Sequence, residues 1–148
     1  PRSKQSPYDG GLRTPIMVRW PGHVTPGRYE TLAGSIDLGP TILAAAGLKP
    51  APEMPGIDLI AVANAGGRSK RDTIFGEIYH HNVADIDDPV PGLRYRWCIS
   101  GNWKLIVPTD SSESNELYNL ADDALETKNL AARNAAVVER LARRIEEW

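Results

Sequence analysis

Short apolar runs in the second half of the chain follow the pattern of β-strands. Each run is rich in β-branched and aromatic residues and is bounded by turn-forming residues. Ser100, Gly101 and Asn102 separate two adjacent runs, as a hairpin turn would. The pattern predicts four antiparallel strands, at residues 73–79, 93–99, 103–107 and 116–120.

The last segment of the chain has the periodicity of an amphipathic helix. Over residues 134–148, most charged side chains lie off one apolar stripe, which is formed by Val137, Val138, Leu141, Ile145 and Trp148. We therefore expect this helix to pack on one face of the sheet, with Leu141 buried and Trp148 partly buried. Four antiparallel strands and one helix make a small α+β subdomain.

The first half of the chain predicts one strand and two short helical segments. Residues 12–20 form a near-continuous apolar run, which is typical of a strand covered on both faces. Asp37 is expected to cap a short helix with its carboxylate, Pro40 suits the first turn, and Gly47 ends the helix. A second helical turn is expected at residues 57–63.

A basic stretch with two glycines marks the expected domain boundary, at residues 65–72. A strand, a loop and a capped helix before it would finish a larger parallel sheet. Residues 1–66 are therefore expected to be the carboxy-terminal end of an α/β domain, and residues 67–148 the small α+β subdomain.

Charge and composition exclude several partners. The chain has 17 Lys and Arg against 19 Asp and Glu, so a net charge of -2 gives no reason to expect nucleic acid or a membrane as partner. No apolar run reaches the roughly 18 residues of a membrane span.

Cys98, the only cysteine, lies in a predicted strand, and we interpret it as a buried structural thiol.

One segment near the start of the chain carries a specific motif. Residues 4–15 read K-Q-S-P-Y-D-G-G-L-R-T-P. This resembles the segment K-x-x-x-Y-E-G-G-x-R-x-P of the sulfatase family, with Asp9 in place of the usual glutamate. Five further segments resemble that family in its own order, at residues 19–27, 36–48, 55–59, 103–106 and 116–131.

The later segments depart from the family pattern at single positions. Asp58 stands where the family usually has serine, Asn119 replaces aspartate, and Ala124 stands where proline is expected. Six segments in order nevertheless cover nearly the whole chain. The chain is therefore identified as a member of the sulfatase family, in its carboxy-terminal portion, with the family's alkaline-phosphatase-like α/β fold.

The resemblance implies a mechanism whose nucleophile and metal ligands are absent from these 148 residues. Family sulfatases use a formylglycine made from Cys or Ser in a C/S-x-P-x-R motif, together with a divalent cation, usually calcium, held by Asp and Asn. Cys98 is followed by Ile-Ser-Gly, so it is not the modified cysteine. The nucleophile and the calcium ligands are expected upstream of Pro1, and this chain alone is expected to be inactive.

Lys4 is the catalytic residue that the resemblance places in this chain. It matches the family lysine that contacts the sulfate group, where an ammonium suits the negative charge of sulfate and its leaving oxygen. The alternative is an ordinary exposed lysine near a chain end. Arg13 also matches a family position, and we interpret it as structural.

His80 and His81 are candidate substrate-binding residues. They follow a predicted strand and, with Tyr79, Arg94 and Arg96, could line a pocket for an anionic sugar or aryl sulfate. The alternative is an exposed strand end with ordinary polar residues.

The expected activity is hydrolysis of sulfate esters by the complete protein. Its partners would be a sulfated small molecule or sulfated sugar and the amino-terminal part of the sulfatase, and the resemblance suggests a periplasmic or secreted enzyme. Two alternatives stay open: a phosphonate or phosphate ester hydrolase of the same superfamily, and a non-catalytic binding module.

Overall fold

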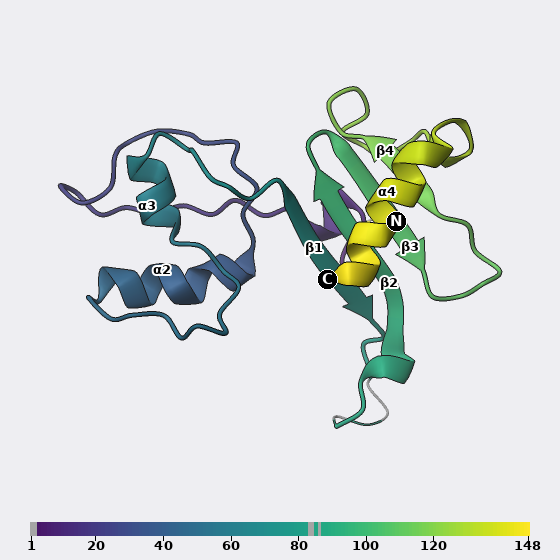
Figure 1. The fold of residues 1–148 in the computed structure, drawn as a ribbon, viewed down its shortest axis with the longest axis horizontal. Helices are drawn as coiled ribbons and strands as arrows, with labels where there is room; N and C mark the ends of the chain where they lie inside the picture. Colours follow the sequence, from purple (N-terminus) through teal and green to yellow (C-terminus); the bar gives the residue numbers. More distant parts are fainter. Residues whose placement is uncertain (1–2, 83–84, 86) are drawn as a thin grey trace. The chain divides into compact units, whose positions relative to one another are not determined.

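A computed structural model describes residues 3–82, 85 and 87–148 of the chain (Figure 1). It forms two compact units, one of Pro1–Thr14 with Phe75–Trp148 and one of Pro15–Ile74. The division therefore differs from the expected boundary after residue 66, because the first 14 residues pack with the C-terminal sheet. That residues 1–66 end a larger α/β domain stays a prediction.

The C-terminal unit is built on the predicted sheet of four strands in the order β1-β2-β3-β4. β2 pairs antiparallel with β3, and β3 pairs antiparallel with β4. Gly101 makes the turn between β2 and β3 with a φ of 57°, a left-handed conformation that glycine adopts readily. The strands are β1 (Thr73–Tyr79), β2 (Leu93–Ser100), β3 (Trp103–Pro108) and β4 (Glu116–Asn119).

One face of this sheet is covered by α4 (Ala135–Glu147), as the apolar stripe predicts (Figure 1). The buried core joins helix and sheet, and consists of Cys98, Leu105, Leu117, Leu141 and Ile145. Trp148 remains 60% exposed, and its ring stacks on Phe75 with centroids 5.3 Å apart. Short 3₁₀ turns η2 (Val90–Gly92) and η3 (Ala131–Arg133) precede β2 and α4.

Leu141→Ala should destabilise the protein by about 2–5 kcal/mol, because Leu141 is 0% exposed and its removal leaves a cavity. Chemical denaturation of the full-length protein measures this cost. Leu125→Ala is the matched control, since Leu125 is 79% exposed and its truncation should change the free energy of unfolding by no more than about 0.5 kcal/mol. Equal shifts for the two variants would contradict the packing described above.

The second unit contains the two predicted helices, α2 (Leu38–Ala45), preceded by η1 (Ser35–Asp37), and α3 (Leu59–Asn64). Gly47 follows α2 with a φ of 73°, as expected of a glycine stop. Asp58 caps α3, because its carboxylate accepts hydrogen bonds from the N–H groups of Ile60 and Ala61.

The expected capping role of Asp37 is wrong. Asp37 precedes α2 but makes no side-chain cap hydrogen bond. Its buried carboxylate instead accepts from the N–H groups of Gly34 and Ile57 and from the Arg71 guanidinium, at 2.6–2.9 Å. These partners come from three separate segments, so Asp37 ties the unit together rather than starting one helix.

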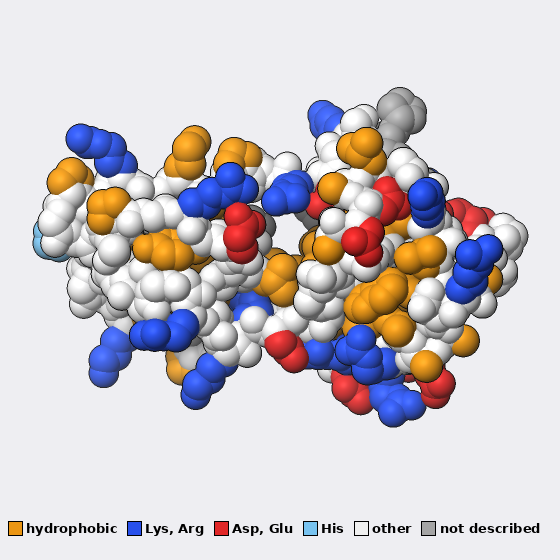
Figure 2. All heavy atoms as spheres, turned by 90° about the horizontal axis from the view of Figure 1, so that it is seen from above, with side chains coloured by type: hydrophobic (Ala, Val, Ile, Leu, Met, Phe, Trp, Pro, Cys, Tyr) orange, Lys and Arg blue, Asp and Glu red, His pale blue; other side chains and the backbone are white. Residues whose placement is uncertain are grey.

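The strand predicted at residues 12–20 is also wrong. Leu12 ends the short helix α1 (Asp9–Leu12), and residues 13–20 belong to no strand of the described structure. A strand forms only when its backbone groups pair with a neighbouring strand, and these residues have none among those described. Met17 is 86% exposed and Val18 45%, and apolar side chains are visible at the surface in Figure 2.

Candidate functional site

Lys4 lies in a tight turn before α1, and its side chain is exposed. Gln5, its neighbour, has a φ of 63°, which is uncommon for a residue other than glycine. The Ser6 hydroxyl donates to the Ser3 carbonyl at 2.5 Å, which closes the turn. The turn therefore has a defined shape that presents the Lys4 ammonium to solvent.

Gly11 lets this turn fold back against α1. A Cβ at Gly11 would lie 2.3 Å from the Ser3 carbonyl oxygen and 2.8 Å from that of Ser6, closer than side chains approach backbone atoms. The second glycine of the Gly-Gly pair is therefore required by close packing between α1 and the turn that carries Lys4.

A buried ion-pair network joins α1 to the sheet. The Lys104 ammonium on β3 lies 2.8 Å from the Asp9 carboxylate and 2.6 Å from that of Glu126. Glu126 also accepts a hydrogen bond from the Asp9 N–H at 2.6 Å. Lys104 is 0% exposed and Glu126 1%, so these two charges are almost fully removed from water, whereas the Asp9 side chain is 15% exposed and lies 3.8 Å from the Arg13 guanidinium.

Two tyrosines extend the contact beside this network. The Tyr8 hydroxyl donates to the Glu116 carboxylate at 2.9 Å, and the Tyr118 hydroxyl donates to the same carboxylate. The Tyr8 and Tyr118 rings meet edge to face, with centroids 6.3 Å apart. Lys104 pairs with Tyr118 across β3 and β4, so both side chains lie on the face opposite to the Leu105–Leu117 pair of the core. The N-terminal segment thus covers the sheet face that α4 leaves open.

The candidate histidines lie at the exposed end of β1. His80 and His81 both have exposed side chains, and the His80 N–H donates to the Gly92 carbonyl at 2.8 Å. The nearby Arg96 and the Tyr79 hydroxyl both bind the Glu77 carboxylate, at 3.0 and 2.6 Å. The hydrogen bond to Glu77 is the main cause that raises the pKa of Tyr79. Two of the expected anion-binding groups are therefore already paired.

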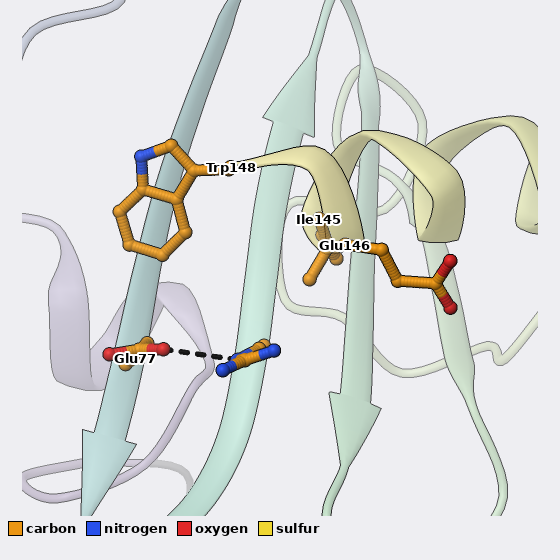
Figure 3. Close-up of a pocket in the computed structure, with 5 residues that line it drawn as sticks. Glu77, Ile145, Glu146 and Trp148 are labelled. Atoms are coloured by element: carbon orange, nitrogen blue, oxygen red, sulfur yellow. Dashed lines mark hydrogen bonds and ion pairs between the residues drawn. The ribbon is translucent and has the colours of Figure 1, made fainter.

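A cavity of about 290 Å³ lies beside this pair, between β1, β2 and the end of α4 (Figure 3). It is lined by Glu77, Arg96, Ile145, Glu146 and Trp148. Two carboxylates line it against one guanidinium, that of Arg96, which binds the Glu77 carboxylate at 3.0 Å. This balance of charge is unfavourable for a sulfate group.

Cys98 is the buried thiol that the sequence predicts. It is 0% exposed, and burial raises its pKa to about 11, so the thiolate is scarce at neutral pH. Within the described residues, no three His, Cys, Asp or Glu side chains gather into a metal site, and no helix is long and apolar enough to cross a membrane.

Comparison with known proteins gives this site its context. The family model described as N-sulphoglucosamine sulphohydrolase, C-terminal, matches residues 3–148. This chain belongs to the sulfatase family. A sulfatase of Formosa agariphila is 34% identical over 136 residues, covering 86% of this chain and 24% of that protein. An N-acetylgalactosamine-6-O-sulfatase of Bacteroides thetaiotaomicron is 27% identical over 97% of this chain and 28% of its own length.

Solved structures share the fold of this chain. One, in complex with its substrate D-glucosamine-2-N,6-O-disulfate, has a TM-score of 0.72 at 21% identity and covers 95% of this chain and 28% of that chain. A phosphonate monoester hydrolase of Agrobacterium radiobacter has a TM-score of 0.62 at 23% identity over 80% of this chain and 25% of its own. Solved-structure neighbours confirm the expected alkaline-phosphatase-like fold class. This chain spans about a quarter of the length of the two sulfatases described above.

The network around Lys104 was not predicted from the sequence. Lys104 stands in an otherwise apolar strand, and Asp9 is the acidic position of the sulfatase motif. A lysine inside such a strand requires a buried carboxylate partner, which was the available signal. No observation brings Lys4 and the two histidines together, so the roles of Lys4, His80 and His81 stay predictions.

Proposed function

We propose that this chain is the C-terminal part of an enzyme that hydrolyses sulfate esters, and that Lys4 contacts the sulfate group. The observation that supports this most directly is the exposed Lys4 turn, which packs against α1, where Asp9 joins a buried ion-pair network, in a chain of the sulfatase family. A lysine without such support would sample many positions, whereas a catalytic ammonium needs one.

Lys4 would act by electrostatic stabilisation. Its ammonium would donate a hydrogen bond to a sulfate oxygen and offset the charge that develops on the leaving oxygen. The formylglycine nucleophile and a calcium ion would come from the part of the sulfatase outside this chain, where the ion would neutralise sulfate oxygens. This chain's own contribution is to hold a positive charge in place.

The proposed substrate is a sulfated sugar. Support comes from the matching family model, whose description names N-sulphoglucosamine, and from a relative named for N-acetylgalactosamine 6-O-sulfate hydrolysis. Steady-state kinetics of the full-length protein on sulfated sugars, an aryl sulfate and a phosphonate monoester tests the function. We expect the highest kcat/KM on a sulfated sugar; a preference for the phosphonate would replace this function with that of the structurally similar phosphonate hydrolases.

His80 and His81 are proposed to contact the sugar rather than the reacting sulfate. The variant His80→Ala/His81→Ala should raise KM for a sulfated sugar several-fold, with a much smaller effect on a small aryl sulfate, because the aryl ester lacks the contacted groups. Both side chains are exposed, so the melting temperature should not change. Equal KM changes for both substrates would remove the histidines from the sugar site.

The 148-residue chain alone should not hydrolyse an aryl sulfate above background, with or without added calcium. The proposed nucleophile lies outside it, and Cys98 is a buried thiol with a raised pKa. The measurement is a discontinuous assay of the purified chain beside its Cys98→Ala variant. Turnover that disappears in Cys98→Ala would overturn the proposed location of the nucleophile.

A further inference from the structure

We propose that Lys104, together with Asp9 and Glu126, is a positioning centre that sets where the Lys4 ammonium stands. Lys104 does not touch the substrate in this proposal; it acts through α1 and the Lys4 turn. The inference rests on the proposed role of Lys4 and adds three positioning residues to it.

The charges of the cluster explain why Asp9 is held so firmly. The buried Lys104 ammonium faces two carboxylates, at 2.8 and 2.6 Å, and the exposed Arg13 guanidinium lies 3.8 Å from the Asp9 carboxylate. Without the Lys104 charge, Asp9 and Glu126 would repel each other at close range with little solvent to screen them, since Glu126 is buried and the Asp9 side chain is 15% exposed. The hydrogen bond from the Asp9 N–H to Glu126 fixes the backbone of α1 as well as its side chain.

Close packing carries this position from α1 to Lys4. The backbone of residues 3 and 6 lies so near Gly11 that a Cβ there would collide with both carbonyl oxygens. Any shift of α1 therefore moves the turn or breaks this contact. Lys4 lies inside that turn, between Ser3 and Ser6.

Glu126 shows that the chain accepts local strain to complete the cluster. Its φ of 55° lies in the left-handed region, which is unfavourable for a residue with a side chain. The loop around it is held by Asp123, whose carboxylate accepts from the N–H groups of Thr127 and Lys128 at 2.8 Å. The strained backbone aims the Glu126 carboxylate at both Lys104 and the Asp9 N–H.

A double-mutant cycle on kcat in the full-length protein tests the proposal, with a sulfate ester as substrate. Lys104→Met should lower kcat at least tenfold with little change in KM, since a displacement of about 1 Å can cost roughly 10²-fold in rate. In a Lys4→Ala background, the same substitution should lower kcat no further, because its effect passes through Lys4. If Lys104→Met lowers kcat by the same factor with and without Lys4→Ala, the two losses are independent and the proposal is overturned. A general structural defect would have that effect, because it acts equally in both backgrounds.

Two further variants keep the test informative if Lys104→Met folds poorly. Gly11→Ala perturbs the other end of the linkage, where no charge is lost, and should also lower kcat without a further effect in Lys4→Ala. Asp9→Glu retains the carboxylate, and we expect it to retain most of the activity, whereas Asp9→Asn should not. Equal activity of Asp9→Asn and Asp9→Glu would show that the charge is not needed.

Hydrogen exchange separates failure of this proposal from failure of the proposed function. The N–H groups of Gly11 and Leu12 donate to the Tyr8 carbonyl, so a peptide spanning residues 8–13 reports on α1. In Lys104→Met this peptide should exchange at least about tenfold faster, while peptides of α4 keep their protection. If the protein has no sulfatase activity but shows this exchange pattern, the proposed function is wrong and the coupling of Lys104 to α1 still holds. If exchange of residues 8–13 is unchanged in Lys104→Met, the coupling itself is overturned.

Discussion

Lys4→Ala in the full-length sulfatase should lower kcat by about 10²–10³, the usual cost of removing one preorganised donor from a developing negative charge. The effect on KM should be smaller, because the ammonium matters most when the leaving oxygen gains charge. Lys4 is exposed and lies in a surface turn, so the substitution should leave the melting temperature unchanged. Steady-state kinetics beside a thermal melt measures both quantities.

Two variants define what the Lys4 side chain must supply. Lys4→Arg should recover only part of the lost rate, because a planar guanidinium does not replace a compact ammonium. Lys128→Ala is the matched control, since Lys128 is another exposed lysine of the same unit, and it should behave as the unmodified enzyme. A Lys4→Ala enzyme with near-normal kcat would remove Lys4 from the catalytic residues.

Elements that depend on local pattern could be predicted from the sequence. The sheet and α4 follow from alternating runs and from one apolar stripe, and both are present close to the expected residues. The predicted strand at residues 12–20 has the same local signal but is absent. The apolar run indicates only that these side chains favour burial. A strand also needs a neighbouring strand to pair with, and the described residues place none beside this segment.

The parts of the site that depend on distant contacts could not be predicted. Lys104 and Asp9 are 95 positions apart in the chain, and nothing in either local sequence indicates that they pair. Asp37 has a local pattern that favours a helix cap, yet its carboxylate is taken by Arg71, 34 positions away. In both cases a charge that is removed from water needs an oppositely charged partner. That partner comes from a distant part of the chain rather than from a residue nearby in sequence.

Asp37→Asn should destabilise the full-length protein by about 3–5 kcal/mol at neutral pH, the usual cost of removing one partner from a buried ion pair. The Asp37 side chain is 0% exposed and that of Arg71 12%, with the closest contact at 2.6 Å. Desolvation raises the pKa of Asp37, but hydrogen bonds from Arg71 and from the N–H groups of Ile57 and Gly34 outweigh it, and the pKa is lowered.

This lowered pKa gives the Asp37 prediction a dependence on pH. A carboxyl group whose pKa is lower in the folded state stabilises that state fully above its unfolded pKa, about 3.9. The contribution is lost as pH falls through the folded pKa. The difference in unfolding free energy between the unmodified protein and Asp37→Asn should therefore be constant above about pH 5 and shrink below about pH 4.

Chemical denaturation across this pH range, with Arg71→Met and the double variant, separates the ion pair from other effects. The double variant should be less destabilised than the sum of the two single variants, because it leaves no unpaired buried charge. Asp110→Asn is the control for a carboxyl group whose pKa is lowered without burial. Hydrogen bonds from Ser112 lower the pKa of Asp110, and the residue is exposed. Additive losses, or a difference for Asp37→Asn that persists in acid, would show that Asp37 and Arg71 do not stabilise this unit as a charged pair.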